Sequence, residues 1–466
     1  MTAIDGRVPR VEYGTGPAID WALVARLRAT ASEQLSEQVS GMQDRLDAPV
    51  QQELGRSIIV GLIESEMADR VRAGRPGWSP GEQRALQHAV FDALFRLGRL
   101  QSLVDDDEVE SVHISGHDKV VLERTDGSVV LAPPVADSDE ELIDFLVFLA
   151  SRSQVNARTF SPAQPRLHMR LDDGSRLAAT AWVTLRPEIT IRRHRLITAM
   201  LPDLVARGLM TPLAASFLAA AVKAHKSIVV TGAQGAGKTT LMRALCAEID
   251  FFEIIGTFET EYELHLHEFP ERHLLVRPWE ARPGTGELLP DGRQAGEFTL
   301  NEELFDSFRF GLSRQIVGEV RGPEIWVMIK AMESGHGSLS TTHSRNARLA
   351  IDKLITCAME AGPHVTEQNA AKKLAQTIDL IVHLDLARHT LPDGTVTKRR
   401  RVSEIVSVQR GEGPLGIAFQ DVFALDVDRQ VAVPNVLPDD FDDLADHGFD
   451  LGAFRLLGHR EQGDVR

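Results

Sequence analysis

The stretch Ser227-Ile-Val-Val-Thr-Gly232-Ala-Gln-Gly-Ala-Gly237-Lys238-Thr239 decides the fold of this chain. Its first residues are mostly β-branched and predict a short buried strand, and the segment 240–248 has helical spacing. A glycine-rich loop between a strand and a helix turns backbone N–H groups toward phosphate oxygens at the positive end of the helix. The pattern G-x-x-x-x-G-K-[ST] therefore predicts a nucleotide-binding loop, whose candidate residues are Gly232, Gln234, Gly235, Ala236, Gly237, Lys238, Thr239 and Thr240.

Two side chains of this loop have specific expected tasks. Lys238 is predicted to reach the β- and γ-phosphates, because its ammonium is the one fixed charge in the loop. The hydroxyl of Thr239 is predicted to ligate Mg²⁺.

Composition narrows the class of protein. The chain has 466 residues, 43% of them hydrophobic, and a formal net charge of −16, which predicts a cytosolic enzyme of about two or three domains. No apolar run approaches the ~18–20 residues that span a bilayer, and the N-terminus lacks the pattern of a secretory signal. Cys246 and Cys357 fall in apolar helical patterns and are expected to be reduced. The acidic balance disfavours non-specific binding to nucleic acid or anionic lipid.

Capping and turn signals divide the chain into four predicted segments. Residues 1–78 are expected to form a helical arm or adaptor, and 79–195 an α+β domain that opens with the capping box Ser79-Pro-Gly-Glu82. The P-loop domain is expected over 196–425 and a C-terminal tail over 426–466. The predicted fold class is therefore α/β: a C-terminal P-loop NTPase domain preceded by an α+β N-terminal domain and a helical N-terminal arm.

Three further stretches suggest chemistry at the same site. The predicted strand at 254–259 ends among carboxylates, including Glu259 and Glu263, where a general base or a Mg²⁺ partner is expected beside a P-loop. The apolar strand at 316–318 ends in Glu319, which is expected to orient the attacking water. Residues 334–344 are rich in Gly, Ser and Thr and contain His336 and His343, which are expected to sense phosphate.

In this order the segments resemble motifs of the ATPases of type II and type IV secretion systems and type IV pili, most closely the Tad/Flp-pilus assembly branch. The four motifs read GAQGAGKTT, TFETEYEL (an Asp box), IVGEVRG (a Walker B) and GHGSLSTTH (a His box). The likeness continues in LDDGSRL at 171–177, TIRR at 190–193, EARP at 280–283 and RVSEI at 401–405, and it covers roughly residues 85–425.

The resemblance implies a RecA-like domain in a homo-hexameric ring, which hydrolyses ATP with Mg²⁺ and powers pilus assembly or protein secretion. It implies a cytoplasmic location, peripheral at the inner face of the cytoplasmic membrane, and inner-membrane platform proteins as partners. Arg176, and Arg192 or Arg193, would reach the phosphates from the first domain or a neighbouring protomer. The other site residues that it implies are Glu319, Glu259, Glu263, Arg282, Arg321, His336 and His343.

Departures from the family pattern leave alternatives open. Thr260 holds the position of the Asp-box aspartate, Ser313 replaces the aspartate that usually precedes the Walker B strand, and Gln315 interrupts the apolar run. These changes admit a nucleotide-gated ring subunit with little hydrolysis. A nucleic-acid motor is a further alternative, for which the basic run Lys398-Arg-Arg-Arg401 is the main signal and an exposed strand edge the competing explanation.

Overall fold

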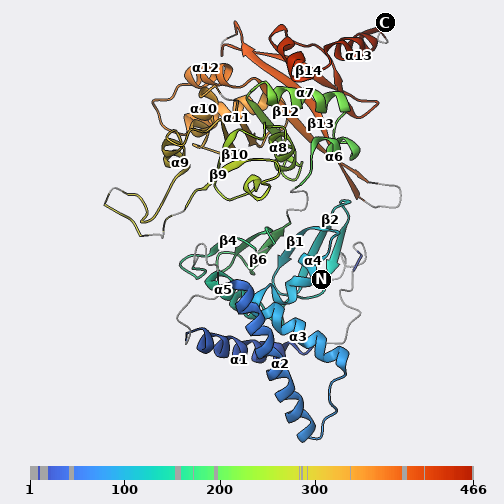
Figure 1. The fold of residues 1–466 in the computed structure, drawn as a ribbon, viewed down its shortest axis with the longest axis vertical. Coiled ribbons are helices and arrows are strands. Elements are labelled where there is room, and N and C mark those ends of the chain that lie inside the picture. Colours follow the sequence, from blue (N-terminus) through green and yellow to red (C-terminus); the bar gives the residue numbers. More distant parts are fainter. Residues whose placement is uncertain are drawn as a thin grey trace. The chain divides into compact units, whose positions relative to one another are not determined.

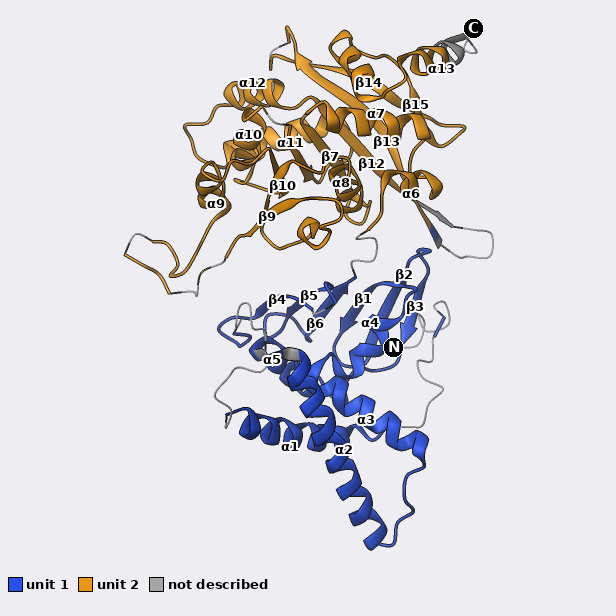
Figure 2. Cartoon of the chain, viewed as in Figure 1, with its two compact units in different colours: residues 1–195, 390–397 blue, residues 196–389, 398–466 orange. Residues whose placement is uncertain are grey.

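The computed structural model describes residues 9–10, 19–40, 47–152, 159–171, 173–193, 198–282, 284, 287–290, 292–335, 337–390, 396–413 and 415–463. The chain folds into two compact units (Figure 2). Unit 1 comprises residues 1–195 and 390–397, and unit 2 comprises 196–389 and 398–466. Among the described residues, no helix combines the length and apolar character that crossing a membrane requires.

Three helices of unit 1 form a layer of their own. The helices of this unit are α1 Trp21–Ser40, α2 Ala48–Arg72, α3 Pro80–Phe95, η1 Gly98–Leu100, α4 Gln101–Asp105 and α5 Asp139–Arg152. Helix α3 begins at the predicted capping box, in which the Ser79 hydroxyl and the Glu82 carboxylate each accept the other residue's backbone N–H. Apolar side chains of α1, α2 and α3 are buried together, among them Leu27, Ile59 and Val90. The predicted boundary at residue 79 thus falls inside this layer, because the apolar face of α3 packs on α1 and α2.

Unit 1 also contains a six-stranded antiparallel sheet in the order β3-β2-β1-β6-β5-β4. Its strands are β1 Val109–Ser115, β2 Lys119–Arg124, β3 Val129–Ala132, β4 Arg166–Arg170, β5 Arg176–Thr180 and β6 Glu188–Arg192. Apolar residues such as Leu177 and Ile191 lie on one face, in a core shared with Leu146 of α5. The alternate residues project from the opposite face, which is more exposed and more polar.

Unit 2 is built on a large sheet whose strands include β9, β10, β12, β13 and β14 (Figure 1). The sheet has nine strands in the order β15-β14-β13-β12-β7-β11-β10-β8-β9. Its strands are β7 Ile228–Gly232, β8 Ile254–Glu259, β9 Leu275–Glu280, β10 Arg314–Val320, β11 Leu339–Thr342, β12 Leu380–Thr390, β13 Val396–Arg410, β14 Ile417–Asp426 and β15 Val431–Pro434. The six strands from β12 to β9 in this order pair in parallel. Parallel strands with helices on both faces are typical of α/β domains, so the predicted fold class is confirmed.

The helices of unit 2 cover both faces of this sheet. They are α6 Leu201–Ala206, α7 Pro212–Lys223, α8 Lys238–Cys246, η2 Leu266–Glu268, α9 Leu300–Ser307, α10 Ile325–Glu333, α11 Ala347–Met359, α12 Glu367–Thr377, η3 Asp439–His447 and α13 Leu451–Gly463. Strand β7 contributes to a separate core on each face of the sheet. Ile228 and Val230 belong to the core with α7 and α8, whereas Val229 belongs to the core with α10, α11 and α12. The strand that precedes the loop is therefore buried on both sides.

The C-terminal segment is integrated into unit 2. Strand β15 pairs with β14, and the ring of Phe217 on α7 packs on Phe423, Phe441 and Phe449 at centroid distances of 5.4, 6.0 and 5.3 Å. The sequence predicted a tail over 426–466, but the described part of this segment contributes to the core around α7, because its phenylalanines fill that core.

Candidate functional site

The loop from Gly232 to Lys238 joins β7 to α8 and has a backbone that requires glycine. Gly237, at the N-cap of α8, has φ +97°, and Gly232 has φ +155°. A methyl group on Gly232 would lie 2.5 Å from the carbonyl oxygen of Leu384 on the neighbouring strand. Side chains at these two positions would distort the loop. Its glycines therefore keep the backbone close to the sheet and directly before the N-terminus of α8, as anion binding requires.

The side chain of Lys238 is folded into this loop. Its ammonium lies 3.3 Å from the carbonyl oxygen of Gly232, 3.2 Å from that of Ala233 and 3.0 Å from Nδ1 of His343. Only 8% of Lys238 is exposed. A buried cation with these neutral neighbours is suited to bind an anion at the loop.

His343 links this lysine to Glu319. Its Nε2 lies 3.0 Å from Oε1 of Glu319. Because an ammonium can only donate, Nδ1 of His343 accepts from Lys238 and the ring proton belongs on Nε2, the nitrogen nearer to Glu319. Residues of three neighbouring strands, or of the loops that follow them, thus form one polar chain.

Glu319 is held as a carboxylate. Its Oε2 accepts a hydrogen bond from Nε of Arg321 at 2.8 Å. Burial would raise the pKa of Glu319, but His343 and Arg321 outweigh it and lower the pKa to about 2. A carboxylate of such low basicity can orient and polarise a water molecule without being protonated itself.

The two predicted carboxylates of β8 and its loop have different surroundings. Oε2 of Glu259 accepts backbone N–H groups from Glu263 at 2.7 Å and Leu264 at 2.9 Å, and Glu259 is 3% exposed. Glu263 instead accepts a hydrogen bond from the Thr239 hydroxyl at 2.9 Å. These contacts favour a supporting role for Glu259 and bring Glu263 to the loop. Thr239 and Glu263 together offer adjacent oxygen donors, which is the ligand chemistry that Mg²⁺ prefers.

Two arginines near the loop were missed as site residues. Arg243 of α8 is 4% exposed and donates to the carbonyl of Glu263. Arg400 of β13 donates from Nε to the carbonyl of Gly235 at 2.8 Å. The sequence explains the run that contains Arg400 either by its charge or as an exposed strand edge, and neither explanation places Arg400 at the loop. Strand alternation, which points Arg400 away from the side of Arg399 and Arg401, could have separated it from them.

The candidate arginines of unit 1 lie on β5 and at the end of β6. Arg176 is the direct cross-strand partner of Arg192, so both project from the same, more exposed face of the sheet. Arg193 follows on the other side, where it donates to the carbonyl of Val109 at 3.4 Å and lies 3.6 Å from a carboxylate oxygen of Asp107. These contacts tie Arg193 to the start of β1 and leave Arg192 as the better candidate.

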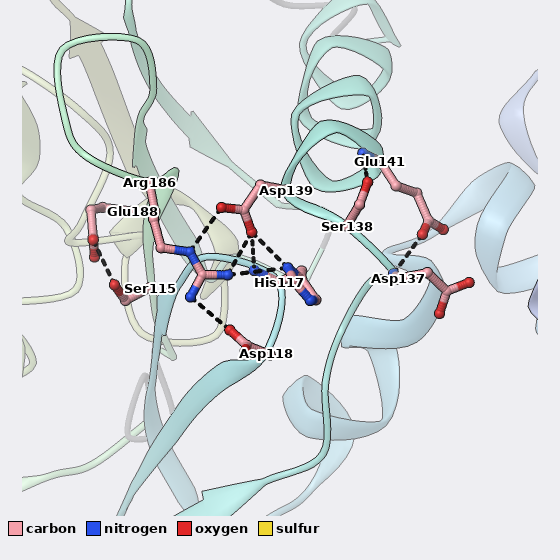
Figure 3. Close-up of polar contacts among 9 residues, drawn as sticks. All are labelled: Ser115, His117, Asp118, Asp137, Ser138, Asp139, Glu141, Arg186 and Glu188. Carbon is pink, nitrogen blue, oxygen red and sulfur yellow. Dashed lines mark hydrogen bonds and ion pairs between the residues drawn. The ribbon is translucent and has the colours of Figure 1, made fainter. Parts of the chain in front are cut away.

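An ion-pair network anchors the loop between these two strands (Figure 3). Arg186 in this loop donates from Nε and Nη2 to the two carboxylate oxygens of Asp139 at 2.8 and 2.7 Å, and its Nη1 lies 2.7 Å from Asp118. Nδ1 of His117 lies 2.7 Å from the same Asp139 carboxylate. The Arg186 guanidinium holds the pKa of Asp139 well below its usual range. The network therefore fixes the connection between the strands that carry Arg176 and Arg192.

The remaining predicted residues lie at varied positions. His336 lies outside the described residues. Arg282 is exposed and donates from Nε to the carbonyl of Gly296 at 2.6 Å, in the segment between β9 and α9. Thr260 is exposed, and the Ser313 hydroxyl accepts the backbone N–H of Ile254 at 3.2 Å, where β8 and β10 begin to pair. Ser313 thus makes a structural contact.

Comparison with known proteins gives a consistent family. Residues 105–413 match the family model described as "Type II/IV secretion system protein". The probable conjugal transfer protein TrbB of Sinorhizobium fredii is 26% identical over 334 residues, which are 70% of this chain and 90% of that protein. The type IV secretion system protein VirB11 of Brucella suis is 26% identical over 348 residues, 67% of this chain and 89% of that protein. A crystal structure of the VirB11 ATPase from Brucella suis in complex with sulphate has 24% sequence identity and a TM-score of 0.33, covering 67% of this chain and 97% of that chain.

Proposed function

This chain belongs to the type II/IV secretion system protein family, and we propose that it hydrolyses ATP as the motor of a secretion or pilus apparatus. The observation that carries the proposal is the polar chain Lys238–His343–Glu319, with contacts of 3.0 Å on each side of the imidazole. It joins a phosphate-binding loop to a carboxylate that can orient water, which are the two elements that hydrolysis of a terminal phosphate requires.

Each residue of the proposed site has a separate role in hydrolysis. Backbone N–H groups of the loop and Lys238 bind the phosphates, and Glu319 orients the attacking water. Because His343 and Arg321 outweigh burial and lower its pKa, Glu319 is ionised and acts by its position and negative charge. Mg²⁺ bound with the nucleotide would neutralise phosphate charge, and Thr239 and Glu263 are the residues that would hold it.

We propose that arginines of unit 1 act as arginine fingers. Arg176 and Arg192 are direct cross-strand neighbours, so their guanidinium groups lie on the same face of the sheet. We infer that they reach the γ-phosphate when a homo-hexameric ring closes, from the same or a neighbouring protomer. This mode of assembly and the Tad/Flp-pilus branch are inferred from the sequence motifs.

The family also suggests where the protein works and which proteins it contacts. From the family resemblance we infer that the protein works in the cytoplasm, peripheral at the inner face of the cytoplasmic membrane, and contacts inner-membrane platform proteins of the apparatus. The basic run favours a nucleic-acid motor less than its charge suggests, because Arg401 is paired with Asp385 at 2.7 Å and Arg400 contacts the loop. A ring subunit with little hydrolysis stays the second candidate, favoured by Thr260 and Ser313.

Hydrolysis by the purified protein tests the proposal. Glu319→Gln should retain ATP binding and lose turnover by about 100-fold or more, because an amide cannot polarise water as a carboxylate does. Glu367→Gln, an exposed substitution at the start of α12, is the matched control and should behave like the parent. If the parent binds ATP and releases phosphate no faster than Glu319→Gln, the nucleotide-gated subunit becomes the better description.

A further inference from the structure

Arg400 reaches from β13 to the phosphate-binding loop. Its Nε donates to the carbonyl oxygen of Gly235 at 2.8 Å. A methyl group on Gly237 would lie 3.8 Å from Cδ of Arg400, so the stem of this side chain runs beside the loop. Gly235 and Gly237 are both left-handed, with φ +76° and +97°, and their backbone has little intrinsic resistance to rotation.

The strand that carries Arg400 is clamped at the next residue. Arg401 is 7% exposed, and its Nε and Nη2 donate to Oδ2 of Asp385 on β12 at 3.1 and 2.7 Å. Arg401 also donates to the side-chain oxygen of Gln430. Because neighbouring residues of a strand project to opposite sides, fixing Arg401 directs Arg400 toward the loop. The contact is therefore supported by a second set of hydrogen bonds and is not a chance surface position.

This contact acts on a single peptide plane. The carbonyl of Gly235 and the N–H of Ala236 belong to the same planar unit and point in opposite directions. Arg400 holds the carbonyl end, and the N–H end donates to the carbonyl of Ala233 at 3.2 Å. With both ends held, the plane cannot rotate freely, although the residue on its N-terminal side, Gly235, is a left-handed glycine.

We propose that Arg400 is a positioning residue for nucleotide binding, which orders the loop by holding the Gly235 carbonyl. This inference rests on the proposed ATP-binding function. A loop ordered before binding avoids the entropy cost of ordering it during binding, so removal of the contact weakens affinity. The effect falls equally on ATP and ADP, because the backbone of such a loop surrounds phosphates that both nucleotides carry. Turnover at saturation is preserved, because Arg400 contacts the loop and not the water-orienting Glu319.

Arg400→Met tests the proposal, with Arg399→Met as the matched control on the exposed neighbour. Calorimetric titration with MgATP and MgADP should give dissociation constants raised about 5- to 30-fold for both nucleotides in Arg400→Met. KM for ATP should rise by a similar factor, while kcat stays within about twofold. Arg399→Met should match the parent in every measurement.

Arg400→Lys distinguishes the effect of the donor position at Nε from the effect of the positive charge. Lysine keeps the positive charge but has no donor at the place of Nε, so it should bind both nucleotides as weakly as Arg400→Met. Both variants should unfold at the parent temperature without nucleotide. If Arg400→Met unfolds at a lower temperature than the parent, the nucleotide affinity of Arg400→Lys is compared with that of the parent instead.

The outcomes separate this inference from the proposed function. Parental affinity in Arg400→Met, full rescue by lysine, a loss confined to ATP, or a loss of kcat at unchanged KM would each overturn the positioning role. In those cases the parent still binds ATP and Lys238→Ala does not, so the function stands. A parent protein that binds neither nucleotide overturns both proposals.

Discussion

His343 lies between Glu319 and the phosphate-binding loop, with its Nε2 3.0 Å from the carboxylate of Glu319. The sheet order explains this position. Strands β7, β11 and β10 are consecutive neighbours and run in parallel, so their carboxyl ends meet at one edge. The loop after β7 provides Lys238, His343 follows β11, and Glu319 lies near the end of β10. One imidazole thus links the lysine that we propose binds phosphate to the carboxylate that we propose orients water.

His343→Ala should slow hydrolysis more than it weakens binding. The substitution removes the group that orients Glu319 and leaves Lys238 with its two carbonyl contacts. We expect kcat to fall about 10- to 100-fold and the dissociation constant of ATP to change less than about threefold. His364→Ala, in an exposed loop, is the control. Unchanged kcat in His343→Ala would show that the histidine contact has no catalytic role.

Lys238→Ala should abolish tight ATP binding, because the proposed phosphate site loses its buried ammonium. A loss of affinity of at least about tenfold is expected from removing a charge-assisted contact. Titration with MgATP measures it, and Lys330→Ala on the exposed side of α10 is the control for charge. ATP affinity equal to that of the control would contradict the assignment of the P-loop.

Arg192→Ala and Arg193→Ala should have different effects although the residues are adjacent. Arg192→Ala, like Arg176→Ala, should lower kcat about 10-fold or more with little change in affinity, because the charge matters most during phosphoryl transfer. Arg193→Ala should instead lower thermal stability, since Arg193 binds the segment before β1. Equal turnover in Arg192→Ala and the parent would remove unit 1 from the proposed site.

Turnover per protomer should rise with protein concentration if the arginines complete a ring. Mixing Glu319→Gln protomers into parental rings should then depress activity by more than dilution alone, because each inactive protomer also affects its neighbours. Activity can be measured across a dilution series alongside the mass of the particles by light scattering. Constant activity from monomer to assembled particle, with proportional loss in mixtures, would make each protomer an independent enzyme.

Glu303→Leu should stabilise the protein in a pH-dependent way. Glu303 on α9 is fully buried, and neither of its carboxyl oxygens has a hydrogen-bond partner among the described residues. Burial, with smaller contributions from Glu280, Glu259 and Glu302, raises its pKa from 4.5 to about 8. A raised pKa means that the folded state binds the proton more tightly, so stability falls as pH rises from about 4.5 to about 8.

Denaturant unfolding at pH 5 and pH 8 measures this effect. Leucine removes the buried acid and should add about 1–3 kcal/mol at pH 8, with a smaller gain at pH 5. Glu302→Gln is the neighbouring control and should not reproduce the stabilisation, because Glu302 forms the capping box of α9. An equal gain at both pH values would show that Glu303 does not titrate in this range.

Local sequence patterns predicted the parts of the site but not their contacts. The alternation of apolar residues, the glycines at left-handed positions and the capping box at Ser79 act within a few residues of the chain. The P-loop, its strand and helix, and the α/β class therefore follow from the sequence alone. The same patterns assign α3 to a different segment from α1 and α2, and they assign 426–466 to a tail outside the P-loop domain. The packing partners of these segments are distant in sequence, and such contacts leave no periodic signal.

Only the tertiary structure decided which side chains meet. Lys238 and His343 are 105 residues apart, and Arg400 is 165 residues from Gly235, so sheet order alone makes them neighbours. The sequence offered Glu259 and Glu263, or Arg192 and Arg193, as equivalents. The fold gives the members of each pair different contacts. Glu259 accepts local backbone hydrogen bonds, whereas Glu263 contacts Thr239 of the loop. Arg193 donates to the backbone of Val109, whereas Arg192 lies on the more exposed face of the sheet. Residue type sets the chemistry available, and strand order and side-chain direction determine where it acts.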